Sequence, residues 1–389
     1  MSGRVLRLVC TAAVAAQAAL APVGAMAVPA PTDPGQRSVA DLLTELQKLY
    51  RQTEQATETY NSAAGQLTRQ RAEVARLDAD LARARLALHD SRGDAGRLAR
   101  EQYQGSSGAL SPYLRLLLAR DPQRALDEGH VIGQLARERA GTLGRLAGSE
   151  KRADELAREA RKALDTQLAL AQRQQRARDD VQGRLHEVER LLASLSKEQL
   201  TALAEFERNG TAEAQRKLLA SGALGDDRPP TQEGEEAVGY AVRQVGKPYQ
   251  WGAAGPKAYD CSGLTSQAWQ HAGTAIPRTS QQQWARLKRI PLNELRPGDL
   301  VVYFPEATHV ALYLGDGMVV QAPRPGAKVK VSPVAAAPVL GAVRPDPGGK
   351  PLAHYTPVKL PAGALNGPDP GLYAAGAPVT SARQAGGGY

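Results

Sequence analysis

One stretch organises the C-terminal part of this sequence, Asp260-Cys-Ser-Gly-Leu-Thr-Ser-Gln-Ala-Trp-Gln-His271. Its apolar residues recur at helical spacing, which predicts a helix that begins directly after Asp260. Cys261 then lies in the first turn, where unpaired N–H groups and the positive end of the helix dipole favour a thiolate. Asp260 is placed to cap the same turn. The stretch therefore favours a reactive cysteine over the alternative, a cysteine buried as apolar filler.

The N-terminus predicts that the chain is exported. Two arginines precede a small and apolar run over 8–23, and Ala25-Met-Ala27 offers the A-x-A pattern that signal peptidase cuts. A membrane anchor is the less favoured alternative, because the run is interrupted and shorter than the roughly 20 residues that a spanning helix needs. Cleavage after Ala27 leaves Cys261 as the single cysteine, so it has no partner for an intramolecular disulfide.

The sequence has six histidines, and one of them is well placed to accept the proton of the Cys261 thiol. Three lie in segments predicted to form an N-terminal helical arm, and His271 is roughly 15 Å from Cys261 along the same helix at 1.5 Å per residue. His354 falls in an unpatterned segment. His309 begins Val310-Ala-Leu-Tyr-Leu314, which is typical of a buried strand. We therefore expect His309 to be the base, and a plain core histidine is the alternative.

A hairpin after His309 brings in a further polar residue. The strand ends at Gly315-Asp-Gly317, and Met318-Val-Val-Gln321 returns. A three-residue loop with a glycine in the left-handed region places Gln321 on the face of His309, where its amide oxygen can orient the imidazole. A two-residue loop reverses the parity and turns Gln321 to the other face. The sequence leaves both geometries open.

These motifs together resemble the NlpC family of papain-like bacterial cell-wall peptidases, over about 237–322. Five motifs carry the resemblance, in the family's order and approximate spacing: Gly246-Lys-Pro-Tyr-Gln-Trp-Gly252, Asp260-Cys-Ser-Gly263, Pro277-Arg-Thr-Ser280, Leu295-Arg-Pro-Gly-Asp-Leu300 and His309-Val-Ala-Leu-Tyr-Leu-Gly315. The resemblance implies an α+β fold in which the cysteine helix packs on an antiparallel sheet. It also implies that the reaction needs no metal and no organic cofactor.

The resemblance assigns roles residue by residue. Cys261 matches the nucleophile, His309 the base, and Gln321 the third polar position, where many relatives have histidine. The oxyanion is expected to accept hydrogen bonds from the Cys261 N–H and from Tyr249, whose phenol lies beside the reactive centre. The candidates for oxyanion or substrate contacts are Tyr249, Asp260, Ser262 and Arg278. For Arg278, contact with a substrate carboxylate and an ordinary surface ion pair are both open.

The resemblance also implies a substrate, the stem peptides of peptidoglycan, cut commonly between D-glutamate and the following diamino acid. The predicted reaction is amide hydrolysis through a thioester. One alternative keeps the scaffold but makes it an N-acetylmuramoyl amidase or an acyltransferase. Another is a non-catalytic coiled-coil adaptor for cell division or wall assembly, against which the intact Cys261 and His309 argue.

Ahead of this domain the sequence predicts a long antiparallel helical hairpin. Apolar residues recur at coiled-coil spacing over 67–88 and again over 181–195. A glycine-rich break at 105–108 separates the two helices, and the apolar stretch 110–118 is expected to form a short helix at the tip. This tip helix either covers the ends of the seam or binds a partner. The hairpin itself either covers Cys261 or positions the enzyme, and a membrane or divisome activator is its expected partner.

Composition and patterning divide the 389 residues into successive segments. Lys and Arg exceed Asp and Glu by 49 − 40 = +9, which favours polyanions, but the charges alternate along helices and no nucleic-acid motif is visible, so nucleic acid is not an expected partner. The predicted segments are a signal peptide 1–27, a spacer 28–37, the helical hairpin 38–220, a linker 221–232, the cysteine peptidase domain 233–345 and a disordered Pro/Gly/Ala-rich tail 346–389.

Overall fold

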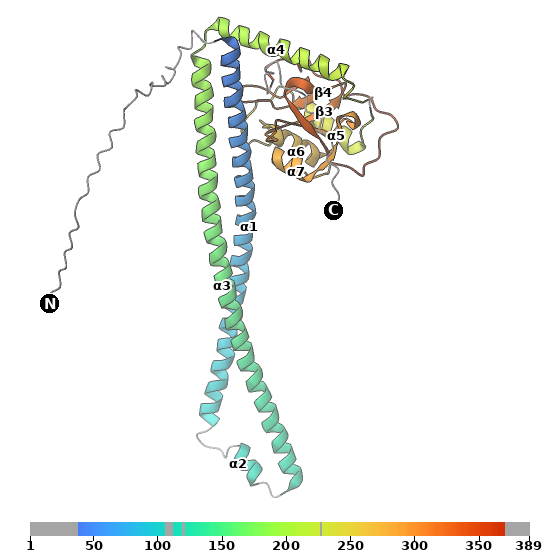
Figure 1. Ribbon diagram of the computed structural model, residues 1–389. Coiled ribbons are helices and arrows are strands. Elements are labelled where there is room, and N and C mark those ends of the chain that lie inside the picture. Colours follow the sequence, from blue (N-terminus) through green and yellow to red (C-terminus); the bar gives the residue numbers. More distant parts are fainter. Residues whose placement is uncertain (1–37, 106–111, 119–120, 226–227, 370–389) are drawn as a thin grey trace, which may run out of the picture.

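The computed structural model describes residues 38–105, 112–118, 121–225 and 228–369. Two long helices, α1 (Val39–Gly105) and α3 (Pro122–Ala193), form an antiparallel hairpin with the short α2 (Pro112–Leu117) at its tip (Figure 1). At the other end α4 (Lys197–Ala220) turns away from the hairpin and reaches across a second, compact domain. The predicted signal peptide lies outside the described residues.

A narrow apolar seam holds the hairpin together. Leu77 and Leu81 of α1 pack with Leu156 and the small Ala160 and Ala163 of α3. Alternating large and small side chains let the two helices approach closely, as the coiled-coil spacing predicts. None of the described helices is both long and apolar enough to cross a membrane.

The hairpin ends at Ala193, whereas the sequence predicted helical hairpin as far as 220. Ser196 breaks the helix because it caps α4: its hydroxyl accepts from the Gln199 N–H, and the Gln199 side chain accepts from the Ser196 N–H. The apolar periodicity continues through this break, because Leu203 of α4 packs with Leu42 of α1 at the same end of the hairpin. The bend between Ala193 and Lys197, which we call the elbow, was therefore hidden within a continuous apolar pattern.

The compact domain is built on a six-stranded antiparallel sheet with the order β1-β6-β2-β3-β4-β5. Helices α5 and α6 pack together beside it, and α7 precedes the first strand. The elements are α5 (Gln232–Val242), α6 (Cys261–His271), α7 (Ser280–Arg286), β1 (Lys288–Ile290), η2 (Leu292–Glu294), β2 (Leu300–Tyr303), β3 (His309–Gly315), β4 (Met318–Gln321), β5 (Lys330–Pro333), η3 (Val334–Ala336) and β6 (Val339–Arg344). This is the α+β arrangement predicted from the sequence.

The two faces of the sheet have different covers. On one face Val302 and Leu312 pack with α5 and α6. On the other, Val301 and Val319 pack with Leu218 of α4. Because both faces are buried, the central strand β2 is buried along its whole length. Helix α4 is therefore part of the core of the second domain as well as the elbow of the arm.

The segment after β6 differs from the sequence prediction. The sequence predicts that residues 346–369 belong to a disordered tail, but they run along the domain. The Leu352 N–H donates to the Pro230 carbonyl, and the Val331 N–H donates to the Ala364 carbonyl at the edge of β5. Lys330 forms an ion pair with Asp369 at 2.8 Å. Buried contacts such as that of Ala364 lie too far apart in the sequence to form a recognisable pattern. The packed unit thus extends beyond 345.

Candidate active site

Cys261 opens α6, as the sequence predicts. The Asp260 carboxylate accepts from the Gly263 N–H at 2.7 Å and caps the helix. A side chain at Gly263 would approach the Ala253 carbonyl oxygen to 2.2 Å, so only glycine fits against this loop. The thiol is buried among apolar core residues. The position combines a capped helix N-terminus with a shielded sulfur.

His309 opens β3 and lies beside Gln321 of β4. The imidazole Nε2 and the Gln321 Oε1 are 2.7 Å apart, and both side chains are buried. The hairpin has a bulge near Gly315, with positive φ at 315–317. It therefore places Gln321 on the face of His309, as the three-residue loop predicts. Since an amide oxygen only accepts, Nε2 carries the proton and Nδ1 is the nitrogen that can take one. Gln321 is thus placed to orient the base.

Replacing Gln321 tests this assignment. His309→Ala should lower turnover of a stem peptide by about 10²-fold or more, because it removes the group that moves the proton. Gln321→Ala should cost about tenfold or less, because the imidazole remains and loses only its orientation. Gln321→Glu retains an acceptor and serves as the matched control. Equal losses for His309→Ala and Gln321→Ala, measured as kcat, would contradict the assigned roles.

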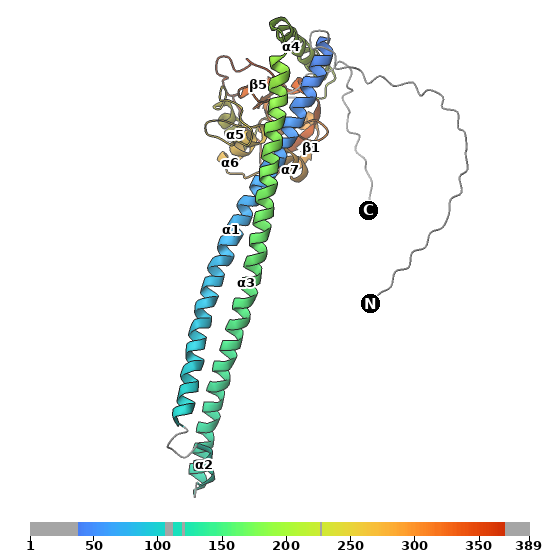
Figure 2. The same cartoon turned by 90° about the vertical axis from the view of Figure 1, so that its left-hand side faces the viewer.

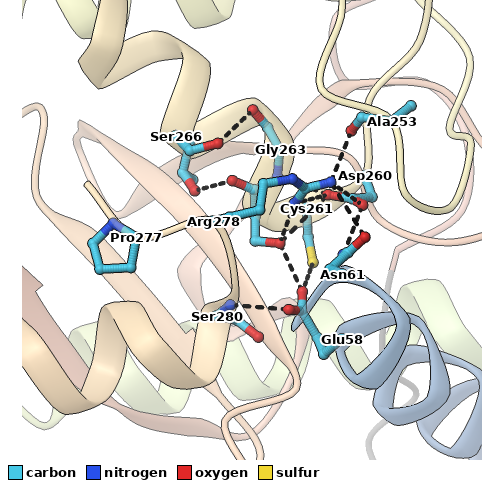
Figure 3. A network of polar contacts seen from close by, with 12 residues as sticks. Glu58, Asn61, Ala253, Asp260, Cys261, Gly263, Ser266, Pro277, Arg278 and Ser280 are labelled. Atoms are coloured by element: carbon cyan, nitrogen blue, oxygen red, sulfur yellow. Dashed lines mark hydrogen bonds and ion pairs between the residues drawn. The ribbon is translucent and has the colours of Figure 1, made fainter. Parts of the chain in front are cut away.

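Arg278 forms a bidentate ion pair with Asp260, with N–O distances of 2.7 and 3.0 Å. It also donates to the Ser262 hydroxyl at 2.9 Å. The carboxylate is fully buried and the guanidinium largely so, so this is not an ordinary surface pair. Arg278 therefore holds Asp260, the cap of the nucleophile helix (Figure 3).

Tyr249 lies in the same core cluster as Cys261. Burial, followed by the neighbouring thiol and carboxylates, raises the pKa of Tyr249 well above its usual value. The phenol therefore keeps its proton and is available as a hydrogen-bond donor. The seven site residues predicted from the sequence thus fall into three groups: Tyr249 and Cys261 share one core cluster, Arg278 holds Asp260 and Ser262, and His309 is hydrogen-bonded to Gln321.

Helix α1 crosses this site, a feature that Figures 1 and 2 show as α1 running between α3 and the second domain. Glu54 Oε1 lies 3.3 Å from His309 Nδ1. One turn later, Glu58 Oε1 accepts from the Ser262 hydroxyl at 2.7 Å and lies 3.7 Å from Cys261 Sγ (Figure 3). The arm thus contacts both the nucleophile and the proton-accepting nitrogen of the base.

Further contacts fix the docked arm on both sides of the catalytic pair. Asn61 donates to Asp260 at 3.1 Å. Toward the elbow, the Arg324 guanidinium lies 4.5 Å from the centre of the Tyr50 ring and pairs with Glu207 of α4 at 3.2 Å. Helix α1 therefore lies along the site over several turns.

The residues of α1 that contact the active site were not predicted from the sequence. Thr53, Glu54, Thr57, Glu58 and Asn61 are all buried, and they recur at helical spacing on α1. A stripe of acids and hydroxyls on a helix is ordinarily a solvated face. Their spacing was visible in the sequence, but the partners of Glu58 and Asn61 lie 204 and 199 residues away along the chain.

Docking changes the charges that the site can carry. Burial, then the Asp260 charge, raises the pKa of Glu58 to about 8. Burial, then the Glu58 and Asp260 charges, raises the pKa of the Cys261 thiol well above its usual value. A thiolate is the reactive form of cysteine, so the docked arm holds the nucleophile in its unreactive, protonated state. Among the described residues, no group of three or more His, Cys, Asp or Glu side chains is arranged to hold a metal.

The fold and the site define the second domain as papain-like, with a buried cysteine that opens a helix and a buried histidine that opens a strand of the sheet. Residues 246–340 match the NlpC/P60 family, and the chain carries an NlpC/P60 domain.

Three curated relatives set this domain in context. The chain is 46% identical to a probable endopeptidase of Corynebacterium glutamicum over 24% of this chain and 45% of the relative, so it spans under half the length of that protein. It is 29% identical to a probable endopeptidase of Mycobacterium tuberculosis over 76% of this chain and 86% of the relative. It is 40% identical to the peptidoglycan endopeptidase RipA of Mycolicibacterium smegmatis over 27% of this chain and 25% of the relative. The similarity to the mycobacterial endopeptidase thus extends well beyond the NlpC/P60 domain.

Proposed function

We propose that this protein is a peptidoglycan endopeptidase that hydrolyses an amide bond of the stem peptide with Cys261 and His309. The observation that carries the proposal is the arrangement of Cys261 on the helix terminus and His309 oriented by Gln321, within an NlpC/P60 domain. The relative named a peptidoglycan endopeptidase supports the substrate class.

The proposed reaction begins when the arm leaves the site. His309 Nδ1 takes the Cys261 proton, and the thiolate attacks the amide carbonyl carbon. The Cys261 N–H and the Tyr249 phenol donate to the oxyanion. His309 then protonates the leaving amine as the carbon–nitrogen bond breaks, which leaves a thioester. Water, deprotonated by His309, hydrolyses the thioester and regenerates the thiol.

The contacts of Glu58 support a D-glutamyl substrate. Its carboxyl group accepts from the Ser262 hydroxyl at 2.7 Å and from the Ser280 N–H at 3.2 Å, and its Oε1 lies 3.7 Å from the sulfur. The Arg278 guanidinium lies beside it. A D-glutamate joined to the diamino acid through its side chain has a free α-carboxylate near the scissile bond. We assign these donors, which we call the carboxylate subsite, to that group.

We further propose that the chain is exported with cleavage after Ala27, and that the docked arm keeps the activity low until a membrane or divisome partner draws it away. Glu54 and Glu58 support this regulation, because together they occupy the base and the nucleophile. The relative of Mycobacterium tuberculosis, matched over most of its length, is similar to this chain across the arm as well as the domain.

Product analysis tests the proposed function. The mature chain, incubated with disaccharide stem peptides, should release fragments that begin with the free amino group of the diamino acid, identified by mass spectrometry. The sugar-linked product should retain alanine and glutamate, because cleavage falls between glutamate and the diamino acid. Release of a complete stem with a free N-terminal alanine would instead identify an amidase and reject the endopeptidase proposal.

A further inference from the structure

Gln283, a residue of α7 that contacts neither Cys261 nor His309, is fully buried beneath the active site. Its Nε2 donates to the Pro277 carbonyl at 2.8 Å and to the Ser262 carbonyl at 3.4 Å. Its Oε1 accepts from the Thr265 hydroxyl at 3.1 Å. Both N–H groups and the oxygen of this amide are therefore engaged, which is the condition for a buried amide to hold a single orientation.

The partners of Gln283 belong to the two elements that make the carboxylate subsite. Ser262 and Thr265 lie in the first turns of α6, directly after the nucleophile. Pro277 immediately precedes Arg278 in the loop that leads to Ser280. The amide thus bridges the nucleophile helix to the loop that supplies the subsite's guanidinium and its backbone N–H.

Among the described residues, the other hydrogen bonds and ion pairs between these elements pass through the subsite itself. Arg278 reaches Asp260 and the Ser262 hydroxyl with its charged end, at the place that Glu58 occupies. A substrate carboxylate would compete for the same donors. Gln283 binds the backbone carbonyls from the buried side, where a ligand does not compete with it.

We infer that Gln283 is a positioning residue that sets the spacing between Cys261 and the carboxylate subsite, and so determines the preference for a stem peptide with a free glutamate carboxylate. The substrate named in this inference rests on the proposed function. Misplacement of a bound group by about 1 Å can cost about 10²-fold in rate, so a bridge of this kind has a measurable effect on selectivity. The nucleophile itself is carried by α6 and does not depend on the bridge.

The test uses the full-length chain with Glu54→Ala and Glu58→Ala, which empties the subsite of its internal occupant. Gln283→Met is nearly isosteric but has no amide, and Gln283→Glu keeps the polarity but cannot donate from its carboxylate. Thr265→Ser is the matched control, because it alters a buried residue beside the same amide while its hydroxyl can still donate to the Gln283 oxygen and both bridging N–H bonds remain. Two tripeptides are compared, one with the free glutamate carboxylate and one with that group amidated.

Gln283→Met and Gln283→Glu should lower the preference for the carboxylate tripeptide over the amidated one by about tenfold, mainly through KM. Thr265→Ser should keep the preference within about twofold. Equal losses on both tripeptides would overturn the inference, because they would indicate general damage to the fold.

Alkylation of Cys261 gives a second readout that needs no peptidase activity. Iodoacetate carries a carboxylate and iodoacetamide does not, so the ratio of their rates reports the subsite beside the sulfur. The ratio should fall in both Gln283 variants, while the rate with iodoacetamide stays within about twofold. An unchanged ratio overturns the inference. If neither tripeptide is cleaved while the ratio falls, the endopeptidase proposal fails and the positioning role of Gln283 stands.

Discussion

Cys261→Ala is expected to abolish stem-peptide hydrolysis, with a loss of at least about 10³-fold. The proposed reaction has no second nucleophile, because Cys261 is the single thiol of the described chain. The replacement is small and apolar, so it should fit the same buried position in the core cluster. Turnover is measured by chromatography of the released peptides.

Two controls separate loss of chemistry from loss of structure. The circular-dichroism spectrum and the binding of the variant to isolated cell walls should match those of the unaltered chain. A thiol alkylator applied to the unaltered chain should remove activity in step with modification of Cys261. Hydrolysis that survives in Cys261→Ala would reject the cysteine-peptidase mechanism.

Removing the two arm glutamates is expected to have the second large effect, in the opposite direction. Glu54→Ala combined with Glu58→Ala should raise turnover of a soluble stem peptide by at least about tenfold, within the usual range of coupling between sites. The change removes the contacts to His309 Nδ1 and Cys261 Sγ and part of the burial that raises the pKa of the thiol. The matched control is Glu73→Ala with Asp78→Ala, which neutralises two acids on the same helix away from the site.

Equal rates for the altered and unaltered chains would contradict occlusion and leave positioning as the task of the arm. Deletion of residues 38–220 would test occlusion only if the remaining domain folded. This deletion also removes Leu218 of α4, which belongs to the core of that domain. Point changes in α1 are therefore the sharper test.

The pH dependence of the arm provides a check that does not rely on deleting contacts. The pKa of Glu58 is 4.5 in its ordinary state and is raised to about 8 by burial in the docked state. Protonation thus favours docking, and this contribution declines as pH rises from about 4.5 to about 8. Activity of the full chain should increase over that window relative to the Glu54→Ala, Glu58→Ala chain. Glu58→Gln, which imitates the protonated acid, should lose this difference.

The sequence predicted those parts of the site that lie in local patterns. Cys261 and its cap are adjacent on one helix, and His309 opens a recognisable strand. Gln321 was undecided, because its face depends on a bulge at Gly315 that changes parity without changing composition.

The position of the arm could not be predicted from local patterns of this kind. Glu54 and Glu58 lie on a helix whose period predicts an antiparallel partner but does not tell which other domain its polar side faces. The elbow at Ser196 was equally hidden, because the apolar period passes through it and only the capping box marks the change of direction. These features arise from contacts between distant segments, for which a single sequence carries little signal.

The elbow gives the arm the geometry of an unequal lever. The hairpin is anchored where Leu42, Val188 and Leu203 pack together, and Glu54 and Glu58 lie on α1 roughly 20 Å from that point at 1.5 Å per residue. The far end of α1, at Gly105, lies roughly 95 Å away by the same rise. A rigid rotation at the anchor would therefore move the tip about four to five times as far as the glutamates. A weak lateral pull at the tip would accordingly exert a several-fold greater force at the catalytic pair.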